Sequence, residues 1–167
     1  SIDSKKRRRW ANLAGLGLVA GLMGYALYAE HVLGLEACPL CIFQRVAMAA
    51  AGLAFLAGAL HGPAGIGRSI YAGLAALGAG AGAAIAGRHV WLQSLPEDQV
   101  PACGPGLDYL IEVLPWREVV ATILRGDAAC ADIDASFLGL SLPAWTLVVF
   151  IGLTLWALLA MMPAKKD

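Results

Sequence analysis

The stretch 71-YAGLAALGAGAGAAIAG-87 is built almost wholly from glycine, alanine and leucine, and it contains no charged residue. It lies within an apolar run from about residue 70 to 90. A helix rising ~1.5 Å per residue needs ~20 residues to cross ~30 Å of hydrocarbon, and this run is long enough. Gly78 and Gly82 form a G-x-x-x-G pair, which lets a second helix approach closely. The stretch therefore predicts a closely packed membrane helix.

Three more apolar runs have a similar length, at about 10–28, 42–60 and 143–162. Of the 167 residues, 59% are hydrophobic and 14% charged, and the mean hydropathy of +0.70 exceeds that of ordinary soluble domains. None of the runs alternates as a strand of a membrane barrel does. We therefore predict an all-α membrane protein with one integral domain, residues 1–167, formed by a four-transmembrane-helix bundle.

The first run contains a second G-x-x-x-G pair, Gly17 and Gly21, for which we also expect close packing. A simple abundance of small residues, with no packing role, is the alternative. No A-x-A-like cleavage site closes this run, so we expect it to be an uncleaved anchor.

Basic residues gather on one side of the predicted spans. They are Lys5, Lys6, Arg7, Arg8, Arg9, Arg68, Lys165 and Lys166. The positive-inside rule then places both termini in the cytoplasm. The connections 29–41 and 91–142 fall outside, and the second of them carries eight acidic residues against two arginines.

The long outer connection also contains apolar residues at near-helical spacing between 109 and 124. They predict a short interfacial helix on the outer membrane surface, broken into two pieces at Pro115. Trp10, Trp91 and Trp145 lie at the ends of predicted spans, where we expect them to anchor the protein at the interface.

All four cysteines lie in or beside the outer connections, where an oxidising compartment permits disulfides. Two of them open the second run, in 38-CPLCIFQR-45. Proline suits the first turn of a helix because its missing N–H is not needed there. Cys38 would therefore stand at a helix N-terminus, whose partial positive charge favours thiolate, and Cys41 would lie within the first turn.

Arg45 follows Cys41 by four residues, so on a helix it lies one turn deeper on the same face. A charge at this depth usually has a partner or a ligand. A static disulfide with a snorkelling arginine is one interpretation. Zinc is disfavoured, because it takes four ligands and the second cysteine pair lacks C-x-x-C spacing, so we expect no metal. Ile42 excludes a haem attachment, which needs histidine there.

Redox exchange is the interpretation that uses every feature of this segment. It needs a thiolate, a partner and an acceptor for two electrons, and a membrane offers quinone. With a quinone ring beside Cys41, Arg45 could hydrogen-bond a carbonyl and stabilise the charge that develops there. The second pair, Cys103 and Cys130, lies among glycines in the long connection. It could instead be a structural disulfide worth about 3–4 kcal/mol.

Three segments together resemble the disulfide bond formation protein B (DsbB) family. They are 38-CPLCIFQR-45, 88-RHVWLQ-93 and 137-FLGLSLPAW-145, and the likeness covers nearly the whole chain in order. The resemblance implies a disulfide:quinone oxidoreductase of the bacterial inner membrane, with ubiquinone or menaquinone as cofactor. It implies a monomer surrounded by membrane lipid, with no nucleic-acid partner.

The resemblance also implies roles for the four cysteines. Cys103 and Cys130 would exchange with a periplasmic thioredoxin-fold oxidase (DsbA-like), and Cys103 would form the mixed disulfide. Electrons would then pass to Cys38 and Cys41, with Cys41 facing the quinone.

By the same resemblance Arg45 supports the quinone and His89 lies near its ring. Taken alone, His89 would be an interfacial histidine, and Arg88 a snorkelling neighbour. Many members carry Glu where this chain has Gln44, a difference that removes a possible charge partner of Arg45.

Two other functions stay open. A vitamin K epoxide reductase-like enzyme also links a loop pair and a C-x-x-C pair to quinone, but its C-x-x-C should come late in the chain. A non-catalytic membrane protein with structural disulfides is the second.

Overall fold

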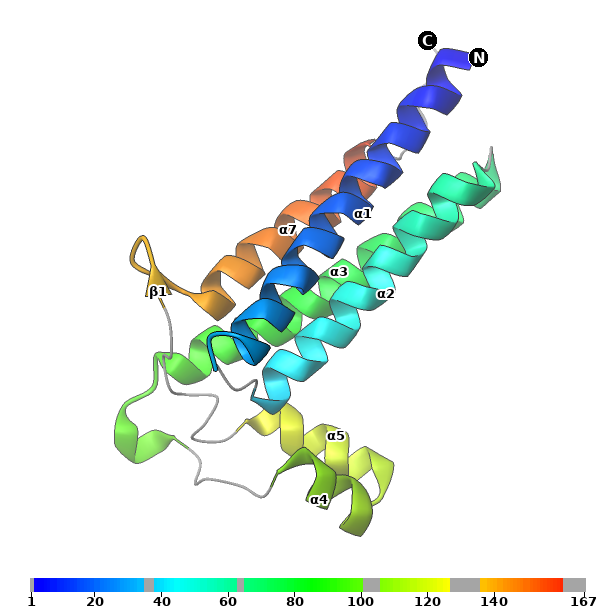
Figure 1. The fold of residues 1–167 in the computed structure, drawn as a ribbon. Coiled ribbons are helices and arrows are strands. Elements are labelled where there is room, and N and C mark those ends of the chain that lie inside the picture. The colour runs from blue at the N-terminus through cyan, green and yellow to red at the C-terminus, as the bar shows by residue number, and fades with distance from the viewer. Residues whose placement is uncertain (1, 35–37, 63–64, 101–105, 127–135, 161–167) are drawn as a thin grey trace.

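The computed structural model describes residues 2–34, 38–62, 65–100, 106–126 and 136–160. The elements are α1 (Ile2–His31), α2 (Pro39–His61), α3 (Ile66–Gln93), the 3-10 helix η1 (Glu97–Gln99), α4 (Leu107–Val113), α5 (Trp116–Arg125), β1 (Ser136–Phe137), β2 (Leu140–Ser141) and α7 (Leu142–Ala160). The four long helices run side by side, and α4 and α5 lie beyond one end of them (Figure 1).

Four segments are long and apolar enough to cross a membrane: Lys5–His31, Pro39–His61, Ile66–Gln93 and Leu142–Leu159. The predicted all-α membrane protein with four spanning helices is confirmed. The first three helices extend past the predicted runs, because hydropathy detects only the apolar middle of a helix whose polar ends continue to coil. The predicted end of the fourth run, at 162, lies outside the described residues.

The helices pack in the order α1, α2, α3, α7, each mainly against the next. Their shared core is made largely of alanines, with Phe55 of α2 and Phe150 of α7 completely buried. The helices α1 and α7 are joined by a hydrogen bond, since the indole Nε1 of Trp156 donates to the Ala11 carbonyl at 3.0 Å. The third helix is thus enclosed between α2 and α7.

The small residues of α3 make this close packing possible. A Cβ added at Gly78 would lie 3.0 Å from the backbone nitrogen of Ala51 in α2. A Cβ added at Gly82 would lie 2.2 Å from the ring of Phe150 in α7. The predicted close approach at this G-x-x-x-G pair is confirmed, with a different helix on each glycine.

The expectation for the pair in the first helix is wrong. A Cβ added at Gly17 or Gly21 would meet no described atom within 4 Å. Close contact occurs instead at Gly15, where an added Cβ would lie 2.8 Å from the Phe55 ring. The motif spacing identifies small residues, whereas the rotation of α1 about its axis decides which of them face a neighbour.

Leucines and other apolar residues seal the end of the bundle that carries α4 and α5. This end cluster consists of Leu40, Leu92, Leu110, Val119 and Ile123, all of them buried. The predicted break at Pro115 is confirmed, because α4 ends at Val113 and α5 begins at Trp116. Val119 and Ile123 are 1% and 2% exposed because the apolar face of α5 covers the bundle end, while the expected position at the membrane surface stays a prediction.

Arg88 helps to hold α5 in this position. Its guanidinium donates to the carbonyls of Leu124 at 3.2 Å and Arg125 at 3.4 Å, and it lies 4.3 Å from the centre of the Trp91 ring. The last carbonyls of a helix lack partners within it, and a cation there also suits the helix dipole. Arg88 therefore caps α5, which corrects its expected role as a snorkelling residue.

Backbone turns complete the same end of the molecule. Gly126 follows α5 at φ 78°, and a Cβ there would lie 2.2 Å from a methyl carbon of Leu92, so only glycine fits. Before α7, β1 and β2 pair antiparallel, and Trp145 donates its indole N–H to the Phe137 carbonyl at 2.8 Å. The interface positions expected for Trp10 and Trp91 stay predictions; both are well exposed on the protein surface.

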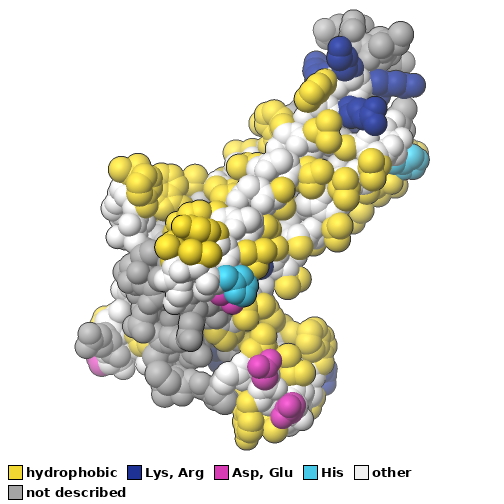
Figure 2. Space-filling model, in the orientation of Figure 1, with side chains coloured by type: hydrophobic (Ala, Val, Ile, Leu, Met, Phe, Trp, Pro, Cys, Tyr) yellow, Lys and Arg dark blue, Asp and Glu magenta, His cyan; other side chains and the backbone are white. Residues whose placement is uncertain are grey.

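Charge is distributed unevenly along the bundle. Figure 2 shows lysines and arginines gathered at the end where α1 begins, and acidic side chains on the segment around α4 and α5. The clustered lysines and arginines thus mark one end of the bundle, and the other end carries most of the acidic side chains.

Candidate thiol site at the start of α2

The two cysteines of the C-x-x-C segment occupy the first turn of α2. Cys38 is the N-cap residue, with φ −69° and ψ 162°, and Pro39 is the first helical residue. The carbonyl of Cys38 accepts the N–H of Ile42 at 3.1 Å, which begins the helical hydrogen bonding. Leu40, between the cysteines, is completely buried in the end cluster. This anchor fixes the turn and leaves both cysteines half-buried at its surface.

The sulfur atoms of Cys38 and Cys41 lie 3.2 Å apart. A covalent disulfide would bring them to about 2.05 Å, so the structure holds this pair as two hydrogen-bonded thiols. Oxidation requires only a small approach of the two side chains. The spacing thus suits a pair that alternates between dithiol and disulfide.

His89, near the end of α3, lies directly against both sulfurs. Its Nε2 is 3.8 Å from the sulfur of Cys38, and its Nδ1 is 3.8 Å from the sulfur of Cys41. The residue is only 3% exposed. Taken from the sequence alone, His89 would be interfacial; the structure instead buries it beside the thiols.

Gln44 sets the state of this imidazole. Its amide nitrogen lies 3.0 Å from Nδ1 of His89, and the Gln44 side chain is also buried. When the amide donates to Nδ1, the proton of the neutral ring is carried on Nε2, where it is available to Cys38. The sequence pointed to Gln44 only as a departure from a common glutamate, and its contact with His89 was missed.

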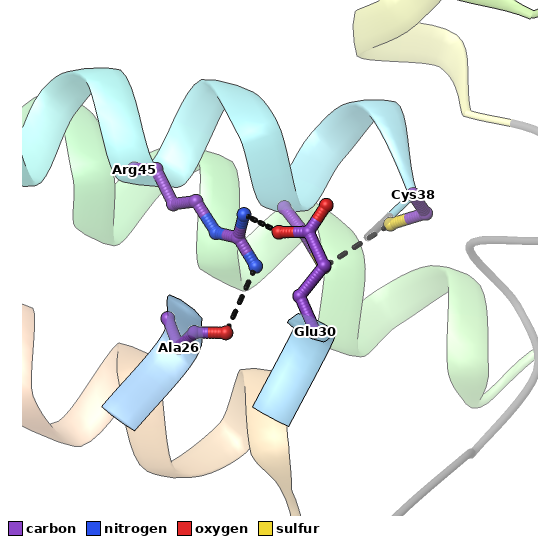
Figure 3. A network of polar contacts seen from close by, with 5 residues as sticks. Ala26, Glu30, Cys38 and Arg45 are labelled. Atoms are coloured by element: carbon purple, nitrogen blue, oxygen red, sulfur yellow. Dashed lines mark hydrogen bonds and ion pairs between the residues drawn. The ribbon is translucent and has the colours of Figure 1, made fainter. Parts of the chain in front are cut away.

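Arg45 faces away from His89, toward α1. Its guanidinium forms an ion pair with the carboxylate of Glu30 and donates to the Ala26 carbonyl at 3.4 Å (Figure 3). The Arg45 and Glu30 side chains are 22% and 32% exposed. Arg45 therefore has a charge partner, although its neighbour is Gln44, and the expectation of a missing partner is corrected.

Sequence analysis missed Glu30 because it placed the first connection at 29–41, beyond the span. In the structure α1 continues to His31, so this carboxylate stands on a membrane helix, where an acidic residue usually has a cationic partner.

Successive helical residues point about 100° apart, at 3.6 residues per turn. Gln44 and Arg45 can therefore serve opposite sides of the same site.

The Cys38, Cys41 and His89 side chains also form a cluster of soft metal ligands. One ligand atom from each lies within 4.8 Å of the other two. His89 was not among the ligands that the sequence suggested when zinc was disfavoured. A closed structural zinc site takes four such ligands, and the described residues supply three. Cys103 and Cys130 lie outside the described residues.

The fold and this site together define a multi-pass membrane protein with a thiol pair that can undergo disulfide exchange. A buried histidine and amide adjoin the pair, and a charged pair stands one turn away. Comparison with known proteins then identifies the family.

The family model of disulfide bond formation protein DsbB matches residues 8–160. A disulfide bond formation protein B of Hahella chejuensis is 55% identical over 140 residues, which cover 83% of this chain and 85% of the relative. One from Xanthomonas euvesicatoria pv. vesicatoria is 51% identical over 156 residues, covering 93% and 91%. The chain belongs to the DsbB family of disulfide bond formation proteins, which gives it a role as a disulfide oxidoreductase.

Proposed function

We propose that this protein reoxidises a periplasmic thioredoxin-fold oxidase and passes the electrons to a membrane quinone. The dithiol of the reduced oxidase would be converted to a disulfide as the Cys103–Cys130 disulfide is reduced. That new dithiol would in turn reduce a Cys38–Cys41 disulfide. Each exchange moves two electrons and two protons. The series of exchanges therefore ends with Cys38 and Cys41 as a reduced pair at the start of α2.

The observation that carries this proposal is the contact between the Cys38 and Cys41 sulfurs and the buried ring of His89. Disulfide exchange proceeds through thiolate, and a neighbouring imidazole can take or return a proton as the sulfur changes state. A purely structural disulfide has no need of a titratable group at 3.8 Å from each sulfur.

The residues around Cys41 fit a quinone by their chemistry. A quinone has an apolar ring with two carbonyl acceptors, and the Gln44 amide, the His89 ring and the Arg45 guanidinium are hydrogen-bond donors. All three lie on helices that are long and apolar enough to span a membrane, where a quinone would be dissolved. When bound, a quinone supplies an acceptor for two electrons and two protons.

The residues around the bound quinone would each have a separate role. Cys41 would deliver electrons, His89 would hold or release the proton lost by sulfur, and Arg45 would orient the acceptor and favour negative charge on it. Glu30 would hold the guanidinium of Arg45 in one orientation. This arrangement and the family favour the proposal over a vitamin K epoxide reductase-like enzyme.

The test is quinone reduction by the full chain in detergent, supplied with a reduced thioredoxin-fold oxidase and a short-chain quinone. We expect turnover by the wild type and none by Cys41→Ser. Ala50→Ser is the matched control, because it adds the same hydroxyl to an exposed position of α2. Equal rates in wild type and Cys41→Ser, or no turnover in either, would leave a protein whose disulfides are only structural.

A further inference from the structure

A cavity of about 450 Å³ lies at the opposite end of α2 from the cysteines. The first turns of α1, the end of α2 and the beginning of α3 form its walls. Its lining residues are Lys5, Lys6, Arg8, Arg9, Asn12, Gly58, Ala59, Leu60, His61, Gly62, Arg68 and Tyr71. The volume is in the range of pockets that hold small molecules.

The described lining of this basic cavity is strongly cationic. Four lysines and arginines come from α1, and Arg68 comes from α3, with no acidic residue among them. The only ion pair between described residues is that of Arg45 with Glu30, far from this end. The cations of the cavity thus have no described carboxylate to neutralise them, and an anion would be attracted to it.

Two buried polar atoms of the same cavity also lack a partner among the described residues. They are Nε of Arg68, a donor, and Oδ1 of Asn12, an acceptor. Asn12 is 5% exposed, and its amide nitrogen already donates to the Arg8 carbonyl at 3.1 Å. A buried group without a hydrogen bond is costly, so both atoms point to a missing ligand.

The position of the cavity limits what that ligand can be. It lies where the spanning part of α1 begins, at Lys5, and beside Trp10, which is 64% exposed. Exposed tryptophans and clustered arginines and lysines mark the headgroup layer of a bilayer. Figure 2 shows basic side chains gathered at this end of the bundle, next to an apolar surface.

We propose that the basic cavity binds the headgroup of an anionic phospholipid. The phosphate would contact Arg8 and Arg68, including the buried Nε of Arg68. A glycerol hydroxyl, as in phosphatidylglycerol, would donate to Oδ1 of Asn12. The acyl chains would lie along the apolar surface of the helices, so the lipid would join α1 to the α2–α3 connection.

The experiment is native mass spectrometry of the full chain in detergent, titrated with phosphatidylglycerol or phosphatidylcholine. We expect one phosphatidylglycerol to be retained in preference to phosphatidylcholine. Arg8→Gln and Arg68→Gln each remove a charge-assisted hydrogen bond to the phosphate, so each should weaken retention roughly tenfold or more. The thermal midpoint without lipid checks that each variant is folded.

Arg7→Gln is the matched control. Arg7 stands beside Arg8 on α1 and carries the same charge, but it does not line the cavity. We expect its replacement to weaken lipid retention by no more than about fivefold, which is the effect of one cation that attracts the lipid without contacting it. An effect equal to that of Arg8→Gln would show diffuse surface attraction and overturn the proposal.

Two further outcomes would also overturn it. Equal retention of the two lipids would mean that the cavity does not select an anion. Displacement of phosphatidylglycerol by an equal concentration of inorganic phosphate would mean that the cavity binds phosphate and not a lipid headgroup.

Discussion

A buried imidazole next to two sulfurs is suited to proton transfer. Sulfur must lose a proton to attack a disulfide and must regain one when it leaves as a thiol. His89 is near both sulfurs, and Gln44 fixes which of its nitrogens carries a proton. The proton on Nε2 would therefore be available to the sulfur of Cys38.

His89→Gln tests this role. Loss of a positioned acid or base typically slows proton transfer on the order of 10²-fold, so we expect a fall of that size in the rate of quinone reduction. Binding of the reduced oxidase should be unchanged. His61→Gln is the control, because His61 bonds Tyr71 at the opposite end of the bundle. Similar losses in both variants would contradict a specific role.

The Glu30–Arg45 ion pair gives a second prediction. We expect Arg45→Ala to raise the KM for quinone strongly. Glu30→Gln should raise it less, because the guanidinium remains but loses the carboxylate that orients it. Both side chains are partly exposed, so the ion pair itself should stabilise the fold by no more than about 1 kcal/mol. Quinone titrations and thermal midpoints measure the two effects separately; an unchanged KM in Arg45→Ala would refute the assignment.

Individual site residues could be predicted from the sequence only where local spacing decides their position. A proline and a helix N-terminus determine where Cys38 and Cys41 lie, so the motif was sufficient to predict their positions. The contacts of Glu30 and Gln44 depend on how α1 and α2 are rotated about their axes, because the rotation decides which neighbouring helix each side chain faces. That rotation is set by the packing between helices, and a short sequence motif carries no information about this packing.

At the scale of the helices, the contact between α3 and α7 depends on the absence of a side chain at Gly82. The Phe150 ring that occupies this space is completely buried and has no room to move aside. The motif thus sets the distance between two helices that are far apart in sequence.

Gly82→Ala should destabilise the protein by about 1–3 kcal/mol, the usual cost of overfilling a packed core. Gly80→Ala is a matched control two residues away, because an added Cβ there would meet no described atom within 4 Å. It should be neutral or slightly stabilising, since alanine favours a helix over glycine. Thermal unfolding in detergent compares them; equal midpoints would contradict the packing argument.

Element prediction succeeded for the spans and for the break at Pro115, because length, hydropathy and proline act locally. It did not identify the residues against which the apolar face of α5 packs. Amphipathic spacing shows that one face must be buried, but a membrane surface and the end of a bundle satisfy that need equally. Leu40 and Leu92 form an apolar surface at the end of the bundle, and α5 buries its apolar face against it.

At the scale of the whole molecule, the basic end and the cysteine end stand at opposite ends of the bundle. The excess of arginine and lysine predicts that the basic end faces the cytoplasm. An exposed residue at each end makes this orientation measurable, and Ile66 and Asp98 are suitable.

In a background with all four cysteines replaced by serine, Asp98→Cys should react with a membrane-impermeant maleimide added to cells with a permeabilised outer membrane. Ile66→Cys should react only after the inner membrane is lysed. The pattern follows from the positions of these residues before α4 and at the start of α3. The reverse labelling would overturn the proposed topology.

The neighbour-to-neighbour order of α1, α2 and α3 has a consequence for synthesis. Each of these helices can associate with the previous one as soon as the ribosome releases it, since their contacts join segments that are close in the chain. The last helix must wait until the long connection has been synthesised. Until then Gly82 lacks the Phe150 ring that packs on it, so we expect the docking of α7 to be the last step of assembly.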